Sequence, residues 1–428
     1  MKILYFHQHF STPKGATGTR SYEFAQALIK RGHQVTMVCG SYTLGNTEGT
    51  ATANGRKLVD GIEVIEIPLA YSNYNSLLSR SMLFLRFALR SVGIALTEKY
   101  DLLFATTTPL TAGLPGIVMK CFRRKPFVFE VRDLWPELPK AMGVVTNPVV
   151  LGGLSLLEWL SYRAADACIG LSPGIVEGIK RRSRKNLPIA MIPNGCDLEL
   201  FQPGDRSKLS LSGIGPGDCV AVFTGAHGQA NGLEAVLDAS AELRRRGRKD
   251  IKFVFIGDGK LKPALQARVA KAGLEECRFF DPMPKRQLND VVSCCDVGLM
   301  ILADVPAFYY GTSPNKFFDY LASGLPVLNN YPGWLAGLIR EHRCGVAVAP
   351  RDPKAFADAM EFLADHPEER KARSRRARQL GETEFAREKL AAEFVAWLER
   401  SAGLSPTDKL RPADGLTPKL RQKDEARV

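Results

Sequence analysis

Apolar and polar positions alternate along the chain so that short apolar runs and longer amphipathic stretches follow one another. Apolar runs of five to nine residues predict buried strands, and apolar residues three or four apart predict helices between them. This alternation of strand and helix predicts a parallel, doubly wound α/β sheet. The strands predicted in the first half are residues 2–10, 33–40, 61–69, 102–106, 127–133, 167–172 and 188–195.

The same alternation starts again in the second half. A turn-rich stretch, PNGCDLELFQPGD at residues 193–205, joins the two halves. We therefore expect two similar Rossmann-like domains, residues 1–195 and 196–385, that face each other across a cleft. The strands predicted in the second half are residues 219–225, 251–259, 277–281, 295–302, 325–329 and 345–349.

The end of the chain has two different patterns. Residues 386–400 predict an amphipathic helix with Phe394, Trp397 and Leu398 on its apolar side. Residues 401–428 are polar and offer little to bury, so we expect a disordered tail there.

Composition and cysteine usage narrow the class of protein. Apolar residues make up 45% and charged residues 24% of the chain, as in ordinary soluble globular proteins. The nine cysteines are scattered without a C-x-x-C pair, and the chain opens on a strand pattern rather than a signal peptide. These features predict a cytoplasmic protein without a disulfide framework or a zinc site.

Positive charge gathers in the first half. The net charge is +13, and residues 1–195 carry 23 Lys and Arg against 13 Asp and Glu, a net +10. A basic half can face an anionic membrane, nucleic acid or an anionic acceptor, or it can be a solvated face. The basic runs KRRSRK and RRRGRK lack interleaved aromatic residues, which argues against nucleic acid.

A long apolar stretch near residues 77–97 carries Arg80, Arg86 and Arg90 within about a third of a helical turn. Its remaining positions are almost all apolar. We expect either a helix that lies in a membrane interface or a helix that covers the first sheet.

The stretch SPNKFFDYLASGLPVLN, residues 313–329, predicts a short helix. Ser313 suits the N-cap, Pro314 the first helical position, and Gly324 the position after the end. The N–H groups of Asn315 and Lys316, the helix dipole and the Lys316 ammonium then form an anion site. With Asp319 on the same face, this end can hold a phosphate and a ribose, or it can be a surface helix with a local Lys–Asp pair.

Three glycine-containing loops follow predicted strands or precede helices. Glycine lets the backbone approach a phosphate or a sugar closely. Because most of these loops lie in the second half, we expect that half to hold a nucleotide and the first half to hold the other substrate. The candidate binding residues are Gly15 and Gly18 in the first loop, Gly225, His227 and Asn231 in the second, and Gly257 and Gly259 in the third.

Polar residues also follow the strand at 127–133. The motif EVRDLWPE places Arg132 and Asp133 at a strand end, where an Asp can orient or deprotonate a hydroxyl nucleophile, or simply form a salt bridge. His7 and His9 end the first predicted strand and should face the same cleft. No D-x-D pair and no metal-spaced cluster occurs, so we expect no catalytic metal.

Four motifs in this order, VRDLWPE, IPNGCDLELFQP, TGAHGQANGLEAVL and SPNKFFDYLASGLPVL, resemble the family-4 retaining glycosyltransferases. The nearest branch is that of bacterial O-antigen, capsule and exopolysaccharide enzymes, including fucosamine-transferase-like members. The resemblance implies the two-domain GT-B fold and a nucleotide-sugar donor, commonly UDP-linked, held by the second domain without a metal. It also implies that helix 386–400 packs back on the first domain.

The resemblance implies roles for single residues as well. The amides at Asn315 and Lys316 would meet the diphosphate, and Asp319 would bind the ribose. Two features of the family are missing, because Gly311 stands where a glutamate is usual and the loop with His227 and Asn231 lacks the usual Arg and Lys. We therefore expect Lys316 to supply the missing charge, with Arg132 and Asp133 as the other catalytic candidates.

The expected activity is transfer of a sugar, of UDP-N-acetylhexosamine type, by a front-face, oxocarbenium-like route. The expected acceptor is a polyprenyl-diphosphate-linked saccharide at the inner leaflet, which implies a peripheral membrane location. The alternatives are a UDP-sugar 2-epimerase of GT-B architecture, which would need no acceptor, and a nucleic-acid-binding protein.

Overall fold

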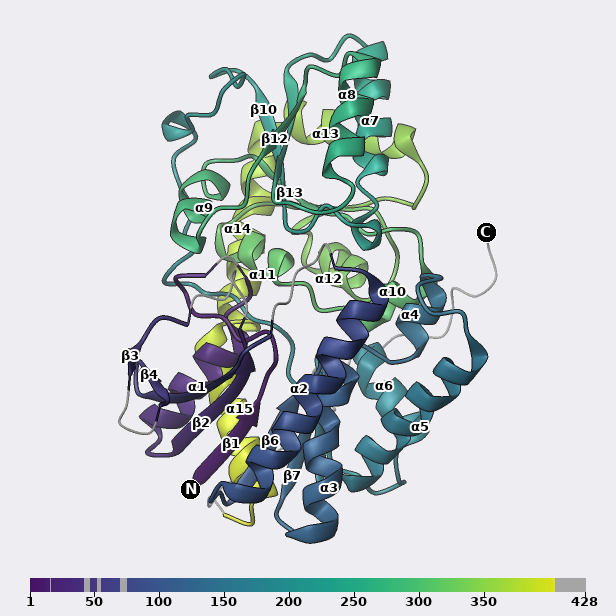
Figure 1. Ribbon diagram of the computed structural model, residues 1–428. Coiled ribbons are helices and arrows are strands. Elements are labelled where there is room, and N and C mark those ends of the chain that lie inside the picture. Colours follow the sequence, from purple (N-terminus) through teal and green to yellow (C-terminus); the bar gives the residue numbers. More distant parts are fainter. Residues whose placement is uncertain (16, 42–46, 52–54, 70–74, 405–428) are drawn as a thin grey trace.

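The computed structural model describes residues 1–15, 17–41, 47–51, 55–69 and 75–404. Two α/β units lie one above the other, each built on its own sheet (Figure 1). Strands β1 to β9 form the first sheet, and strands β10 to β15 form the second. The predicted α/β class with two Rossmann-like domains is confirmed. The tail expected to be disordered lies, from residue 405 onward, outside the described residues.

The first sheet has the strand order β3-β4-β5-β2-β1-β6-β7-β8-β9. Its central strands β6 and β7 are buried at every residue, which explains their continuous apolar sequences. Its strands run parallel except that β4 pairs antiparallel with β3 and β5, an edge that the sequence pattern did not predict. The strands are β1 (Lys2–Phe6), β2 (Gln34–Gly40), β3 (Thr50–Ala51), β4 (Lys57–Val59), β5 (Ile62–Ile67), β6 (Leu102–Thr106), β7 (Phe127–Val131), β8 (Ala167–Gly170) and β9 (Ile189–Met191).

Helices cover both faces of the first sheet. Helix α3 packs against both α2 and α5, and these three lie together on one side of the domain (Figure 1). Helix α5 begins at Pro148, where Asn147 caps it by accepting from the N–H groups of Val149 and Val150. The helices are α1 (Arg20–Lys30), α2 (Leu77–Thr97), α3 (Leu114–Phe122), α4 (Glu137–Ala141), α5 (Pro148–Ala164) and α6 (Pro173–Arg182).

The second sheet has the order β12-β11-β10-β13-β14-β15, and its strand pairs are all parallel. Its strands are β10 (Cys219–Thr224), β11 (Ile251–Ile256), β12 (Cys277–Phe280), β13 (Val297–Met300), β14 (Val327–Asn329) and β15 (Gly345–Ala347). Its helices are η4 (Gln229–Asn231), α7 (Glu234–Arg245), α8 (Lys262–Ala272), α9 (Lys285–Val292), α10 (Pro306–Gly311), α11 (Asn315–Ala322), α12 (Trp334–His342), α13 (Pro353–Asp365) and α14 (Pro367–Thr383).

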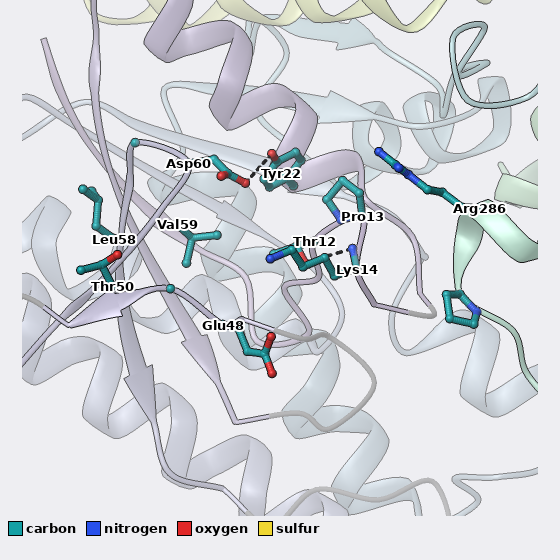
Figure 2. A pocket seen from close by; sticks show the side chains of 13 residues that line it. Thr12, Pro13, Lys14, Tyr22, Glu48, Thr50, Leu58, Val59, Asp60 and Arg286 are labelled. Atoms are coloured by element: carbon teal, nitrogen blue, oxygen red, sulfur yellow. Dashed lines mark hydrogen bonds between the residues drawn. The ribbon is translucent and has the colours of Figure 1, made fainter.

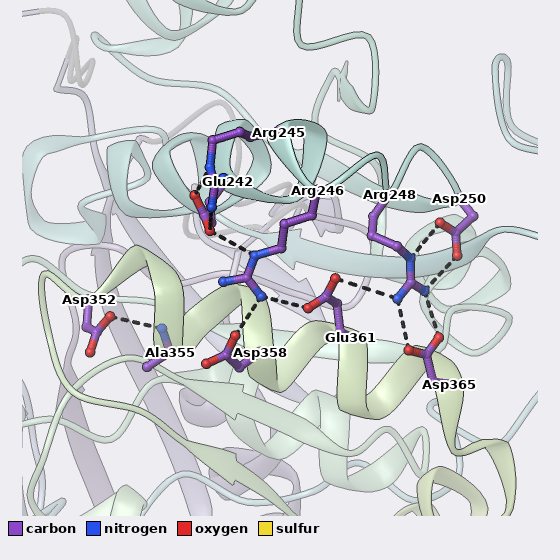
Figure 3. Close-up of polar contacts among 10 residues, drawn as sticks. All are labelled: Glu242, Arg245, Arg246, Arg248, Asp250, Asp352, Ala355, Asp358, Glu361 and Asp365. Atoms are coloured by element: carbon purple, nitrogen blue, oxygen red, sulfur yellow. Dashed lines mark hydrogen bonds and ion pairs between the residues drawn. The ribbon is translucent and has the colours of Figure 1, made fainter.

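An ion-pair network joins α7 to α13 on the surface of the second domain (Figure 3). Arg246 pairs with Glu242 on its own helix and with Glu361 of α13 at 2.7 Å. Arg248 pairs with Asp365 at the end of α13 at 2.8 Å. Networks of this kind fix the register of two helices more than they stabilise the fold, because exposed pairs are worth about 0–1 kcal/mol each.

The chain crosses between the domains twice, and the two crossings lie together. The N–H of Cys196 donates to the carbonyl of Phe385 at 2.7 Å, and Arg387 pairs with Asp197 at 2.8 Å. Beyond this point α15 (Arg387–Ser401) packs on α1, with Phe394 stacked on Phe24 at 4.3 Å between ring centroids. The final helix therefore lies against the first domain.

Candidate functional site

The start of α11 differs from the expected cap. Pro314, not Ser313, is the N-cap residue, and its side chain makes no capping bond. The Ser313 hydroxyl instead accepts from the N–H of Asn194 at 3.0 Å, and the Asn194 amide donates to the Ser313 carbonyl. The Ser313 hydroxyl, which was expected to cap α11, is therefore hydrogen-bonded to the segment that joins the two domains. In the described part of the chain, the N–H groups of Asn315 and Lys316 have no hydrogen-bond acceptor, as an anion site requires.

Lys316 lies partly buried behind this helix start. Its ammonium donates to Asn231 Oδ1 at 2.8 Å and sits 4.0 Å from the centroid of the Phe223 ring. Burial lowers the pKa of Lys316 to about 7. Among the described residues it forms no ion pair. A partly buried cation of this kind gains strongly from an anionic ligand.

Asp319 does not pair with Lys316. Its carboxylate accepts from Lys285 of α9 at 3.1 and 3.3 Å, and both side chains are only 8% exposed. The interpretation of a local Lys316–Asp319 pair on a surface helix is therefore wrong, because α11 turns the two side chains to different partners. Lys285 was missed in the sequence analysis, since nothing near it in the chain links it to a residue that lies 34 positions further on.

The glycines that follow β10 and β11 are required by different contacts. A Cβ at Gly257 would lie 1.9 Å from the Gly225 carbonyl, and a Cβ at Gly259 would lie 2.5 Å from the His227 carbonyl. Packing between the two loops therefore accounts for both. A Cβ at Gly225 would instead point at the Lys316 side chain, 3.4 Å from its Cε, and Gly225 has a φ of +129°. Gly225 thus lies directly beside the proposed anion site.

His227 faces the protein interior rather than the cleft. It is fully buried among Phe223, Phe255 and Phe279, with ring centroids 5.8 to 6.4 Å away. Burial, with help from nearby Lys262 and Lys316, lowers the pKa of His227 to about 4, so the ring is neutral at pH 7. Of the candidates in this loop, Asn231 is the one whose side chain reaches Lys316.

The glycine loop of the first domain crosses to α11. A Cβ at Gly18 would lie 2.6 Å from Asn315 Nδ2, so only glycine lets this loop approach the helix so closely. Gly15 closes a turn by donating to the Thr12 carbonyl at 2.9 Å. The structure therefore brings Gly18, Asn315, Lys316, Gly225 and Asn231 to one place between the domains.

A second cluster lies at the carboxyl ends of β1 and β7. Strand β1 ends at Phe6, so His7 and His9 lie in the loop that follows it rather than in the strand. Arg132 Nη1 is 3.2 Å from His7 Nε2, and Thr108 donates to Asp133 at 3.0 Å. Burial raises the pKa of Asp133, although the Thr108 hydrogen bond opposes the shift.

Burial also sets the charge of the two histidines. It lowers the pKa of His9 to about 4 and holds the pKa of His7 well below its usual range, and Arg132 adds to both effects. Both rings are therefore neutral at pH 7, and their lowered pKa values make them weak bases. The Asp133 carboxylate, whose pKa burial raises, is the better proton acceptor of this cluster.

A pocket of 920 Å³ opens between the domains, next to the glycine loop of the first domain (Figure 2). Lys14 lies on its first-domain wall, and Pro284 and Arg286, which flank Lys285, line it from the second domain. On the first-domain wall the Tyr22 hydroxyl donates to Asp60 at 2.8 Å. The volume suits a ligand of drug or oligosaccharide size.

No group of three or more His, Cys, Asp or Glu side chains in the described parts of the chain is arranged to hold a metal ion. Two lysine ammonium groups belong to this region: Lys316 on α11 itself, and Lys285, which pairs with Asp319 of α11.

Two sequence families match the chain, one in each half. Residues 15–195 match the family described as glycosyl transferase 4-like domain, and residues 218–366 match the family described as glycosyl transferases group 1. A D-inositol 3-phosphate glycosyltransferase of Nocardia farcinica is 30% identical over 183 residues, covering 41% of this chain and 39% of that protein. An alpha-D-kanosaminyltransferase of Streptomyces kanamyceticus is 25% identical over 185 residues, covering 43% and 46%. The matches thus span less than half of these relatives.

Solved structures share the fold over nearly the whole chain. Sucrose-phosphate synthase of Thermosynechococcus elongatus superposes with a TM-score of 0.75 at 17% identity, covering 94% of this chain and 100% of that one. HepE of Anabaena, solved with UDP-glucose, superposes with a TM-score of 0.69 at 17% identity and the same coverage. The chain therefore has the two-domain GT-B fold, and its first and second halves match the glycosyl transferase 4-like domain and the group 1 glycosyl transferases respectively.

Proposed function

We propose that this protein transfers a sugar from a nucleoside diphosphate to a hydroxyl group of an anionic acceptor, with retention at the anomeric carbon. The observation that carries the proposal is the partly buried Lys316 ammonium, placed beside the unbonded amides at the start of α11. The named relatives transfer sugars, and HepE was solved with UDP-glucose. A UDP-linked donor of N-acetylhexosamine type is the form we propose here.

Lys316 and the α11 amides would act on the leaving group. Negative charge builds on the diphosphate as the glycosidic bond breaks, and donors fixed in place stabilise that charge without reorganisation. A good donor of this kind contributes ~3 kcal/mol to the transition state. The nearby Gly225 leaves room for phosphate oxygens against the backbone, and Asn231 holds the ammonium in position.

The acceptor would bind on the first domain, where the Asp133 carboxylate, whose pKa burial raises, can receive the hydroxyl proton. Gly311 stands where the family resemblance places a glutamate, so no carboxylate is available there as a nucleophile. We therefore favour a front-face, oxocarbenium-like route with no covalent intermediate. The Lys316 ammonium and the α11 amides would carry out the charge neutralisation that a metal performs in other transferases.

We further propose that the acceptor is a polyprenyl-diphosphate-linked saccharide used in surface polysaccharide assembly at the inner face of the cytoplasmic membrane. The net +10 of the first 195 residues supports an anionic acceptor. Relatives named for D-inositol 3-phosphate also have an anionic acceptor in their name. Both kinds of acceptor belong in the test below.

Donor affinity should depend on pH through Lys316. The diphosphate binds the protonated ammonium, whose pKa in the free protein is about 7. Below that pH the site is charged and affinity is constant, and above it each pH unit should raise the dissociation constant of a nucleotide sugar up to about tenfold. His9 and His227, with pKa values of about 4, do not titrate in this range. Calorimetry in buffers of different ionisation enthalpy should detect uptake of one proton above pH 7. A flat profile between pH 6 and 9 would contradict this assignment.

Asp319→Asn should raise the dissociation constant for the donor, since Asp319 is the proposed ribose ligand. It should also lower stability, because it leaves the buried Lys285 without its partner. The double variant Asp319→Asn/Lys285→Met separates the two effects: it should recover most of the thermal stability but not donor affinity. Donor binding equal to that of the unaltered protein in the double variant would refute the ribose role.

The activity itself is tested by a panel of nucleotide sugars screened by thermal shift, followed by incubation of the best donor with polyprenyl-diphosphate-linked saccharides and with phosphorylated polyols. We expect a UDP-sugar to stabilise the protein, and NMR of the product to show the donor's anomeric configuration. Conversion of the donor to a 2-epimer without any acceptor would contradict the proposal and favour the epimerase alternative.

A further inference from the structure

Helix α2 carries an apolar stripe on the side that faces away from the first sheet. Five large apolar side chains of this helix are 43% to 76% exposed: Leu78, Met82, Leu85, Leu89 and Leu96. Their spacing places them within about 60° of one another around the helix axis, on a line about 27 Å long. The opposite side of the helix, with Phe87 and Ala88, is buried against the domain. A helix of a soluble domain normally places its apolar side inward only.

The neighbouring helices extend this exposed apolar face. Helix α3, which packs beside α2, ends on Phe122, whose side chain is 75% exposed. Helix α5, which packs beside α3, exposes Val149 at 81%, Leu156 at 56% and Trp159 at 43%. These three helices lie on one side of the first domain (Figure 1). Exposed apolar side chains on neighbouring helices at one side of a domain are typical of a contact with a membrane or with another protein.

The charges on this face have one sign. Arg86 and Arg90 are exposed beside the α2 stripe. Helices α2 and α3 contain no Asp or Glu, and the one carboxylate of α5, Glu158, is buried and paired with Arg182 at 2.6 Å. Arg80, which the sequence analysis grouped with Arg86 and Arg90, is instead partly buried near His9 in the cleft. An apolar stripe flanked by arginines and free of carboxylates complements the surface of an anionic bilayer.

We propose that the outer face of α2, α3 and α5 docks this protein onto an anionic phospholipid bilayer, with α2 lying in the interface. No helix in the described residues is long and apolar enough to cross a bilayer, so the contact lies along the surface. The same helix reaches the site, because the Phe84 ring on its inner side lies 6.3 Å from the His9 ring in the cleft. Docking would therefore hold the cleft next to the bilayer. This inference goes beyond the proposed reaction and is tested without donor or acceptor.

The test is flotation of the full chain with vesicles of 70% phosphatidylcholine and 30% phosphatidylglycerol at low salt. We expect the unaltered protein to float with these vesicles and to stay at the bottom with pure phosphatidylcholine. Leu85→Glu/Leu89→Glu should lower the bound fraction about tenfold or more. Arg86→Gln/Arg90→Gln should lower the partition coefficient about fivefold for each arginine.

The matched control is Ala264→Glu/Ala267→Glu, which adds the same charge on exposed positions of α8 in the second domain and should float like the unaltered protein. Stabilisation by UDP checks that each variant is folded, and Leu85→Gln/Leu89→Gln is the milder replacement if the first variant does not fold. An unaltered protein that stays at the bottom with the anionic vesicles would overturn the proposal. Flotation of the leucine variant equal to that of the unaltered protein would also overturn it. So would an unaltered protein that is dimeric and does not float, if the leucine variant is monomeric, because the face would then bind a second copy of the chain.

Discussion

Lys316→Ala is expected to lower turnover by about 100-fold or more, because it removes the ammonium at the start of α11 and with it ~3 kcal/mol of transition-state stabilisation. The ammonium is held by Asn231 at 2.8 Å and by the Phe223 ring. The variant should remain folded, since the partly buried charge makes no ion pair among the described residues and its loss leaves no carboxylate uncompensated. Initial rates at saturating donor measure the effect.

Two comparisons make this result specific. Lys271→Ala removes an exposed lysine from the end of α8 and should leave turnover unchanged. Lys316→Arg keeps a positive charge but not the compact ammonium, so its activity should be intermediate. Full activity in Lys316→Ala would show that the phosphate site has been placed wrongly.

Glu130→Ala should cause the largest loss of stability, about 3–5 kcal/mol in the free energy of unfolding of the first domain. Glu130 is fully buried and pairs with the equally buried Arg20 at 2.7 Å. It also accepts from the Thr106 hydroxyl at 2.7 Å. Arg20 in turn donates to the carbonyl of Ile192 at 2.7 Å, so the pair ties α1 and β7 to the joint between the domains. Without Glu130, a buried guanidinium charge remains uncompensated.

Urea denaturation of Glu130→Ala measures this loss of stability. Two further variants show whether the loss comes from the unpaired buried charge. Arg20→Met/Glu130→Met removes both charges and should recover part of the stability. Glu177→Ala breaks an exposed pair with Arg181 and should change the free energy of unfolding by less than about 0.5 kcal/mol. A loss below about 1 kcal/mol in Glu130→Ala would contradict the account of this pair.

The sequence was a good guide to the fold because its signals are local. The apolar runs that became β6, β7 and β10 are continuous, and the turn-rich joint near residue 196 separates two repeats of the same alternation. The exceptions depend on context beyond the pattern. Strand β1 stops at Phe6, where the apolar run ends, although the predicted strand continued through His7 and His9 to Phe10. The antiparallel edge strands β3 and β4 are too short to give a periodic signal.

The sequence pointed to several residues of the candidate site, but it did not predict which side chains these residues contact. The glycines, Lys316 and the helix start of α11 predicted an anion site, and the structure brings Gly18, Asn315, Lys316 and Asn231 together. Partners from distant elements could not be predicted, because Lys285 meets Asp319 only through tertiary packing. For the same reason Ser313 is bonded to Asn194 and not to its own helix.

His227 illustrates the other source of error. Its position in a glycine-rich loop after β10 resembles that of a ligand-binding residue, and the sequence analysis placed it in the donor site. Three phenylalanines from β10, β11 and β12 surround its ring instead. Whether a loop side chain faces the cleft or the core depends on which aromatic residues its neighbouring strands present, and a single motif does not carry that information.

The most direct test of the donor site is a crystal structure of the protein with a UDP-sugar bound. We expect the diphosphate oxygens to lie about 3 Å from Lys316 Nζ and from the N–H groups of Asn315 and Lys316. A nucleotide bound elsewhere, with the start of α11 unoccupied, would contradict the account.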